Sequence, residues 1–319
     1  MFQRQALVIG NSNYEAIPRK PCVNDANDMC LALRSIGFLT HCATDLDSYQ
    51  MGKRTNRFAQ SIEPNSLVIF YFSGLGVQYN DFNYLIPTDN AQINSGNIKE
   101  DAINVENFID TMRNKAPRAI IVILDCCRPH RELGRQMPFF DRQTLGLLQG
   151  LAPVRPPPST IIAYSGAEGA PVTSLIIKGR NSIFTHHLLR HITTPNADVD
   201  TMLRRVSSNV QQETRNRQIP IRYSNVYENI CLVPAGSFQN NPMWNYGMQL
   251  KQPFGIRDYQ SPSTPYPSNI FPLQLNYFQQ KFTQPAVMSR RYIASQAHQQ
   301  PHATRRRRNR SAIPSVNHF

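Results

Sequence analysis

Short apolar runs alternate with amphipathic segments over the first 234 residues of the chain. The apolar runs are rich in β-branched and aromatic residues and predict buried strands: Ala6–Ile9, Phe38–Ala43, Leu67–Phe72, Ile120–Leu124, Thr160–Tyr164 and Asn229–Val233. The segments between them predict helices: Asn24–Ser35, Ser48–Gln60, Val105–Arg113, Ser182–His191 and Ala197–Thr214. Apolar strands that alternate with helices are typical of an α/β fold with a mostly parallel sheet covered on both faces.

Two strand ends carry groups that are typical of an active site. Sites in open parallel sheets form at the carboxyl ends of the strands. The third predicted strand runs into Ser73-Gly74-Leu75-Gly76, and the fourth runs into Asp125-Cys126-Cys127-Arg128. An acid and a thiol beside a loop of small residues indicate a cysteine nucleophile next to a substrate-binding loop. The alternative is a tight turn beside two half-buried cysteines, because free Cys is among the most buried residue types.

Several stretches of the chain resemble the caspase-like domain of paracaspases, metacaspases and their bacterial relatives. The resemblance lies in residues 6–37, in FYFSGLGVQYNDFNYLIPTD at 70–89, in IVILDCCRPH at 121–130 and in residues 163–192. It continues to Pro220 and covers about residues 1–233 in the family's order. It implies a three-layer caspase-like fold in which helices flank a six-stranded, mostly parallel sheet.

The resemblance also implies which residues form the active site. Family members carry Ser-Gly-His-Gly, whose His is the general base, and Asp-x-Cys, whose Cys attacks the peptide carbonyl. The matching nucleophile is Cys127, and the backbone N–H groups of Gly76 and Cys127 would form the oxyanion hole. Asp25 and Asp125 match the acids that line the specificity pocket, where they would favour Arg or Lys before the scissile bond. A helix N-cap is the alternative interpretation of Asp25, and the two roles are compatible.

The position of the family's catalytic His is occupied by Leu75. Leucine can neither accept a proton nor pair with a thiolate, and a free Cys is only a few per cent ionised at neutral pH. Losing a general base costs roughly 10²–10⁴ in rate. We therefore expect either a weakened or inactive cysteine endopeptidase, or a non-catalytic scaffold that retains the fold and the cleft.

The other histidines give no clear replacement for the missing base. His130 lies three residues past Cys127 and is the one alternative, provided that the chain folds back. The neighbours His186 and His187 face different directions on a predicted helix and make a poor metal pair. The six cysteines lack zinc spacing. We therefore expect no metal and no cofactor and, in the absence of a secretory signal, no disulfide framework.

Most of the net positive charge follows Pro234, where the periodic pattern stops. Of the net charge of +13, residues 235–319 carry +9, with ten basic residues against one acid, Asp258. The same segment holds nine of the 24 prolines, and such a composition predicts a disordered tail. The resulting division is a caspase-like domain, 1–234, and a tail, 235–319. Within the domain we expect a large-subunit-like part (1–128), a linker (129–159) and a small-subunit-like part (160–234).

The resemblance implies peptides or proteins as partners, either as substrates or as ligands of a scaffold. Family members commonly pair through their last strand, which predicts a homodimer through Asn229–Val233. Five arginines between Arg305 and Arg310 favour nucleic acid or an acidic partner, or nuclear import. No apolar run reaches the ~20 residues of a membrane helix. We therefore expect no membrane contact and a cytoplasmic, or through the arginine run a nuclear, location.

Overall fold

The computed structural model describes residues 3–14, 21–89, 93, 96–127, 151–152, 154–166 and 179–234. All of these lie in the first of two compact units, Met1–Gly255, and the second unit is Ile256–Phe319. The predicted tail and most of the predicted linker therefore lie outside the described residues.

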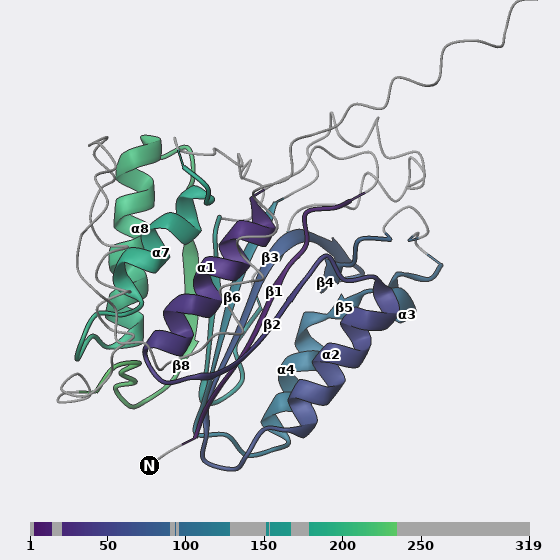
Figure 1. The fold of residues 1–319 in the computed structure, drawn as a ribbon, viewed down its shortest axis with the longest axis horizontal. Coiled ribbons are helices and arrows are strands. Elements are labelled where there is room, and N and C mark those ends of the chain that lie inside the picture. The colour runs from purple at the N-terminus through teal and green to yellow at the C-terminus, as the bar shows by residue number, and fades with distance from the viewer. Residues whose placement is uncertain are drawn as a thin grey trace, which may run out of the picture. The chain divides into compact units, whose positions relative to one another are not determined.

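Within this described part of the chain, eight strands form one sheet (Figure 1). The strands are β1 (Arg4–Gly10), β2 (Leu39–Thr44), β3 (Leu67–Tyr79), β4 (Phe82–Ile86), β5 (Ile103–Asn104), β6 (Ala119–Cys127), β7 (Thr160–Tyr164) and β8 (Ile221–Asn225). The main order is β2-β1-β3-β6-β7-β8. All neighbours along this path are parallel except β8, which is antiparallel to β7, and β4 and β5 extend the sheet beside β3 as an antiparallel pair.

Helices cover both faces of this sheet (Figure 1). They are α1 (Cys22–Ser35), α2 (Ser48–Gln60), α3 (Ile98–Asp101), α4 (Val105–Arg113), α7 (Ile183–His191) and α8 (Val199–Thr214). One hydrophobic core joins α1, α7 and α8 to the sheet, and a second joins α2 and α4 to its other face. The three-layer, mostly parallel α/β fold expected from the sequence is confirmed, but the sheet that the described residues form has eight strands and not six, because β4 and β5 add to the six of the main path. None of the helices that the structure describes is long and apolar enough to cross a membrane.

The last strand of the sheet differs from the prediction. Asn229–Val233 is not a strand, and apart from an isolated bridge between Asp198 and Cys231 it runs as irregular chain. Its apolar side chains are instead buried against the core that contains α8. The edge of the sheet is β8, whose sequence Ile-Arg-Tyr-Ser-Asn alternates too weakly to be predicted. The prediction of a homodimer through residues 229–233 therefore loses its basis, because these residues do not form a strand.

The residues after Phe72 do not form the loop or turn expected from the sequence. β3 continues through Ser73 and Leu75 to Tyr79, then reverses into β4. Leu75 pairs with Ile86 across this antiparallel hairpin. The hairpin has a small apolar core of its own, which explains why the strand does not end where the apolar run ends.

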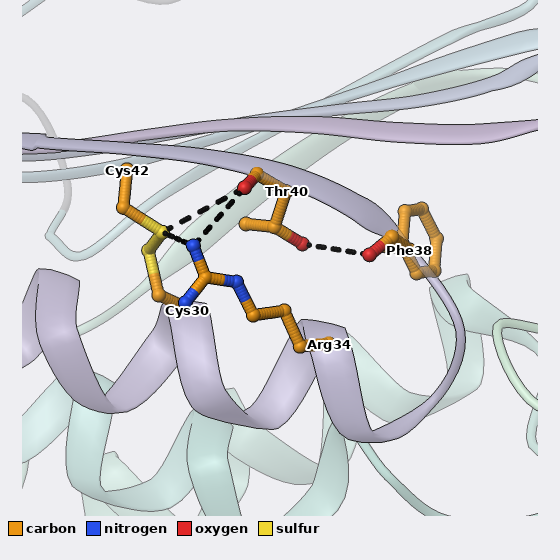
Figure 2. The surroundings of a disulfide bond; sticks show 5 residues. All are labelled: Cys30, Arg34, Phe38, Thr40 and Cys42. Atoms are coloured by element: carbon orange, nitrogen blue, oxygen red, sulfur yellow. Dashed lines mark hydrogen bonds between the residues drawn. A yellow bond between two sulfur atoms is a disulfide. The ribbon is translucent and has the colours of Figure 1, made fainter. Parts of the chain in front are cut away.

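A disulfide joins α1 to β2, although the sequence led us to expect no disulfide framework (Figure 2). Cys30 and Cys42 are bonded, with their Cα atoms 6.3 Å apart. The Arg34 guanidinium lies beside this bond, 3.3 Å from the Cys42 Sγ. Cysteine spacing could not reveal this pair, because it arises from the packing of a helix on the strand that follows it.

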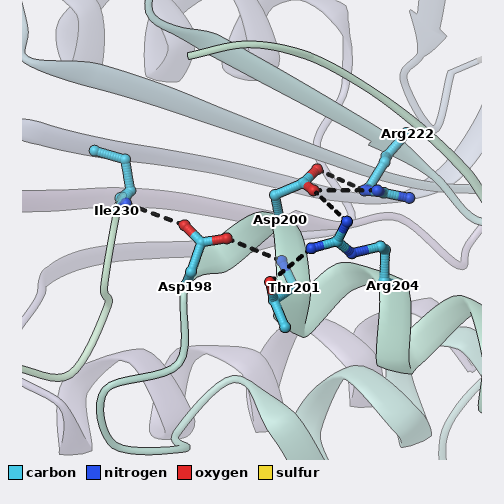
Figure 3. Close-up of polar contacts among 6 residues, drawn as sticks. All are labelled: Asp198, Asp200, Thr201, Arg204, Arg222 and Ile230. Carbon is cyan, nitrogen blue, oxygen red and sulfur yellow. Dashed lines mark hydrogen bonds and ion pairs between the residues drawn. The ribbon is translucent and has the colours of Figure 1, made fainter. Parts of the chain in front are cut away.

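The segment that follows β8 is held by the start of α8 (Figure 3). The Asp198 carboxylate caps α8 by accepting from the Thr201 N–H at 3.0 Å and also accepts from the Ile230 N–H at 3.2 Å. Two residues on, Asp200 accepts two hydrogen bonds from Arg222 of β8, at 2.6 and 3.1 Å. These contacts fix both β8 and the residues after it against α8.

Candidate active site

Two buried carboxylates meet at the carboxyl end of the parallel strands. Asp125 lies near the end of β6, and its register partner on β3 is Ser73. Asp25 lies in the first turn of α1 and accepts a hydrogen bond from the Ser73 hydroxyl at 3.2 Å. Asp25 is 0% exposed and Asp125 is 4% exposed. The structure thus brings together the two acids that the sequence assigned to a specificity pocket.

The close approach of α1 to the sheet depends on Gly10 at the end of β1. A Cβ atom at this position would lie 2.2 Å from the Cys22 carbonyl oxygen and 2.6 Å from the Ala26 Cβ. Helix α1 begins at Cys22 after Pro21, so Asp25 is not its N-cap, contrary to one interpretation of the sequence. Because the helix starts two residues earlier than expected, Asp25 falls inside the first turn and on the face that packs on the sheet.

Ser182, the N-cap of α7, joins the two acids. Its backbone N–H donates to Asp25 Oδ1 at 2.9 Å, and its hydroxyl donates to Asp125 Oδ2. The Thr185 hydroxyl donates to the same Asp125 oxygen at 2.8 Å. Since that hydrogen is then used, the Thr185 oxygen accepts from the buried Tyr71 hydroxyl. A relay of hydroxyl groups from three elements, β3, α7 and its cap, therefore ends on Asp125.

Within the described part of the chain, no cation balances the acid pair. Among the residues that the structure describes, no Lys or Arg forms an ion pair with either carboxylate. Burial, together with the nearby Asp125 charge, raises the pKa of Asp25 to about 8. Burial also raises the pKa of Asp125, against the opposing effect of the Ser182 and Thr185 hydroxyls. Two such groups share a proton near neutral pH or require a positively charged ligand.

Leu75 follows Ser73 by two residues on β3 but belongs to an apolar cluster. Its side chain is 2% exposed and packs in the core of the β3–β4 hairpin with Tyr14 and Ile86. Its backbone N–H donates to the Tyr14 hydroxyl at 2.8 Å, and that hydroxyl donates to the Ile86 carbonyl at 3.0 Å. The position at which the resemblance implies a general base is thus filled by hydrocarbon.

Cys127 is the last residue of β6, and its register partner on β3 is Leu75. Its backbone is described, but its side chain lies outside the described part of the structure. The preceding Cys126 is 4% exposed and packs in the core beneath α2 and α4. A Cβ atom on Gly76 would come within 3.0 Å of the Cys126 Sγ. Cys126 is therefore a packing residue, and the oxyanion-hole roles of Gly76 and Cys127 remain predictions.

The histidines that the structure describes have other surroundings. His187 Nε2 lies 2.6 Å from the Glu213 carboxylate, and His191 Nε2 lies 2.8 Å from the Asn209 amide. His41 is on β2, with its ring against Phe58. His130, the alternative base considered above, lies outside the described residues.

Sequence reasoning missed the hydroxyl groups that hold the acids, namely those of Tyr71, Ser73, Ser182 and Thr185. Only Ser182 had a local signal, because a serine directly before an apolar helical segment is a favoured N-cap. Tyr71, Ser73 and Thr185 lie in a predicted strand, loop and helix, and nothing in these patterns indicated a role at the site. The hydroxyl contacts of Ser73, Ser182 and Thr185 with the acids join residues 48 to 60 positions apart in the chain, which no local pattern records.

Comparisons with known proteins identify a family. A family model described as the caspase domain matches residues 3–230. No curated protein matches the chain. The crystal structure of a protein from Geobacter sulfurreducens is similar at 12% identity over 76% of this chain and 98% of that chain, with a TM-score of 0.49. That likeness is too distant to carry an argument, but the family model spans most of the chain. The chain therefore belongs to the caspase-domain family of peptidases, which act on proteins and peptides.

Proposed function

We propose that this caspase domain binds peptides or proteins through a basic residue and does not hydrolyse them efficiently. The observation that carries this proposal is the buried pair of Asp25 and Asp125, with which no Lys or Arg of the described residues forms an ion pair. A positively charged side chain between them would replace the shared proton and form charge-assisted hydrogen bonds. Arg suits such a site better than Lys, because its planar guanidinium can bind carboxylates through two parallel bonds.

The proposed loss of hydrolysis rests on Leu75. In the caspase-like domains that the sequence resembles, a His at this position activates the cysteine. Here the side chain is leucine, and it is buried among Tyr14, Tyr84 and Ile86. The His187 and His191 side chains, two of those that the structure describes, are bonded to partners on α8. A thiol at Cys127 without a base beside it would be mostly protonated and a weak nucleophile.

A peptide pair that differs only in charge tests the binding half of this proposal. A labelled peptide that ends in Arg is expected to bind the full chain about tenfold or more tightly than the same peptide with citrulline, measured by fluorescence anisotropy. A charge-assisted hydrogen bond contributes about 1.5–3 kcal/mol, and about 1.4 kcal/mol corresponds to tenfold in affinity. Asp25→Asn is expected to remove the preference for Arg.

The matched control is Asp110→Asn, because Asp110 is an exposed acid on α4, on the other face of the sheet. This variant should bind Arg and citrulline peptides as the wild-type chain does. Equal affinity of the wild-type chain for the two peptides would show that the acid pair does not recognise a basic residue.

A further inference from the structure

A cavity of about 200 Å³ lies at the end of the sheet opposite to the acid pair. Arg4, Leu67 and Arg118 line it from the amino ends of β1, β3 and β6, and residues 229–231 and Pro234 line it from the segment after β8. It is thus separate from the candidate active site, which lies at the carboxyl ends of the same strands.

Arg4 brings to this cavity a positive charge that no acid of the described chain segments neutralises. Its Nη1 donates to the carbonyl oxygens of Ile36, at 3.2 Å, and Leu232, at 3.0 Å. Within the described residues, its Nε and Nη2 atoms have no hydrogen-bond partner and its guanidinium pairs with no acid. Burial also lowers the pKa of Arg4, as expected for a charge partly removed from water. One edge of the guanidinium is therefore fixed, and the Nε–Nη2 edge is available for a carboxylate.

The second arginine in the cavity is already neutralised. Arg118 donates from Nε and Nη2 to the two oxygens of Glu228, at 2.8 and 2.7 Å. The rest of the lining is largely apolar, with Leu67, Ile230 and Pro234. One unpaired cation beside apolar side chains matches a ligand with a single negative charge and a hydrocarbon body.

The wall of the cavity is held in place without a ligand. The Ile230 N–H donates to Asp198 (Figure 3). Cys231 forms a backbone bridge with the same residue. Asp198 in turn caps α8. The Cys231 thiol is free and partly exposed at this wall. The site is therefore preformed, which reduces the entropy lost on binding.

We propose that this cavity binds a small monocarboxylic acid with a short hydrocarbon chain, whose carboxylate pairs with the Nε–Nη2 edge of Arg4. The volume equals that of about six or seven water molecules in the liquid, which suits a ligand of this size. The site does not depend on the acid pair or on any peptidase activity.

Protection of Cys231 from alkylation tests the proposal on the full chain. Sodium hexanoate at constant ionic strength is expected to slow the reaction of Cys231 with iodoacetamide about tenfold when present at ten times its Kd. The reaction is followed by mass spectrometry of the peptide that contains Cys231. Hexanamide, which has the same shape without the charge, is expected to protect at least about tenfold more weakly.

Two variants separate the role of Arg4 from general effects of charge. Arg4→Gln is expected to abolish protection by hexanoate, whereas Arg113→Gln, a change at an exposed arginine of α4 that does not line the cavity, is expected to preserve it. Equal protection by hexanoate and hexanamide, or no protection by either, would overturn the proposal on the wild-type chain alone. The comparison of the two ligands therefore decides the matter even when Arg4→Gln fails to fold.

Discussion

Leu75→His is expected to raise the cleavage of an Arg-ending fluorogenic peptide by at least about tenfold over the wild-type chain. A positioned general base contributes roughly 10²–10⁴ in rate. The backbone already places position 75 opposite Cys127 on the neighbouring strand. A His side chain at position 75 would therefore extend from a Cα atom next to that of Cys127. We set the expected gain at the low end because the site is a packed apolar cluster, and the new side chain must leave it to act.

The controls for this gain are Leu75→Asn and the double variant Leu75→His, Cys127→Ala. The asparagine variant introduces a polar side chain without a base of suitable pKa and should gain nothing. The double variant should return to background, because the gained activity requires the thiol. No gain in Leu75→His, with the variant folded, would mean that position 75 is not where this chain can use a base.

Asp25→Asn is expected to remove much of the dependence of stability on pH. Burial raises the pKa of Asp25 to about 8 in the folded chain, from an ordinary value of 3.8. Between these values the folded state holds a proton that the unfolded state has lost, so its stabilising effect is present at low pH and falls as pH rises toward 8. The free energy of unfolding therefore falls by up to about 1.4 kcal/mol for each unit of rising pH. Asparagine has no such proton.

Urea unfolding at pH 5.5, 6.5 and 7.5 measures this difference. From pH 5.5 to pH 7.5, the free energy of unfolding of Asp25→Asn should rise by up to about 3 kcal/mol relative to that of the wild-type chain. Asp110→Asn, at an exposed position, should run parallel to the wild-type chain. If the Asp25→Asn and wild-type curves are parallel as well, the acid pair does not hold a proton in the folded state.

The elements with strong local signals were predicted closely. The helices at Ser48–Gln60 and Val105–Arg113 have the expected bounds, and Asp47 and Asn104 cap them. The failures share one cause, which is tertiary packing. Ile230, Leu232 and Val233 are buried as a strand would be, yet the Ile230 N–H is taken by Asp198 and not by a neighbouring strand.

The candidate site was predicted in part for the same reason. Family resemblance assigned Asp25 and Asp125 to one pocket, and the structure brings them together. It could not assign the hydroxyl groups of Tyr71 and Thr185, because their role depends on the relation of β3 to α7. Nor could the sequence show that Leu75 is buried in the core of a hairpin, since that hairpin begins where the apolar run appeared to end.

Hydrolysis of an Arg-ending fluorogenic peptide by the full wild-type chain, compared with Cys127→Ala, tests the central claim most directly. Since Leu75 supplies no general base, the two rates are expected to be indistinguishable, while both proteins still bind the peptide in preference to its citrulline counterpart. Turnover by the wild-type chain that Cys127→Ala abolishes would contradict the claim and identify the chain as an active cysteine endopeptidase.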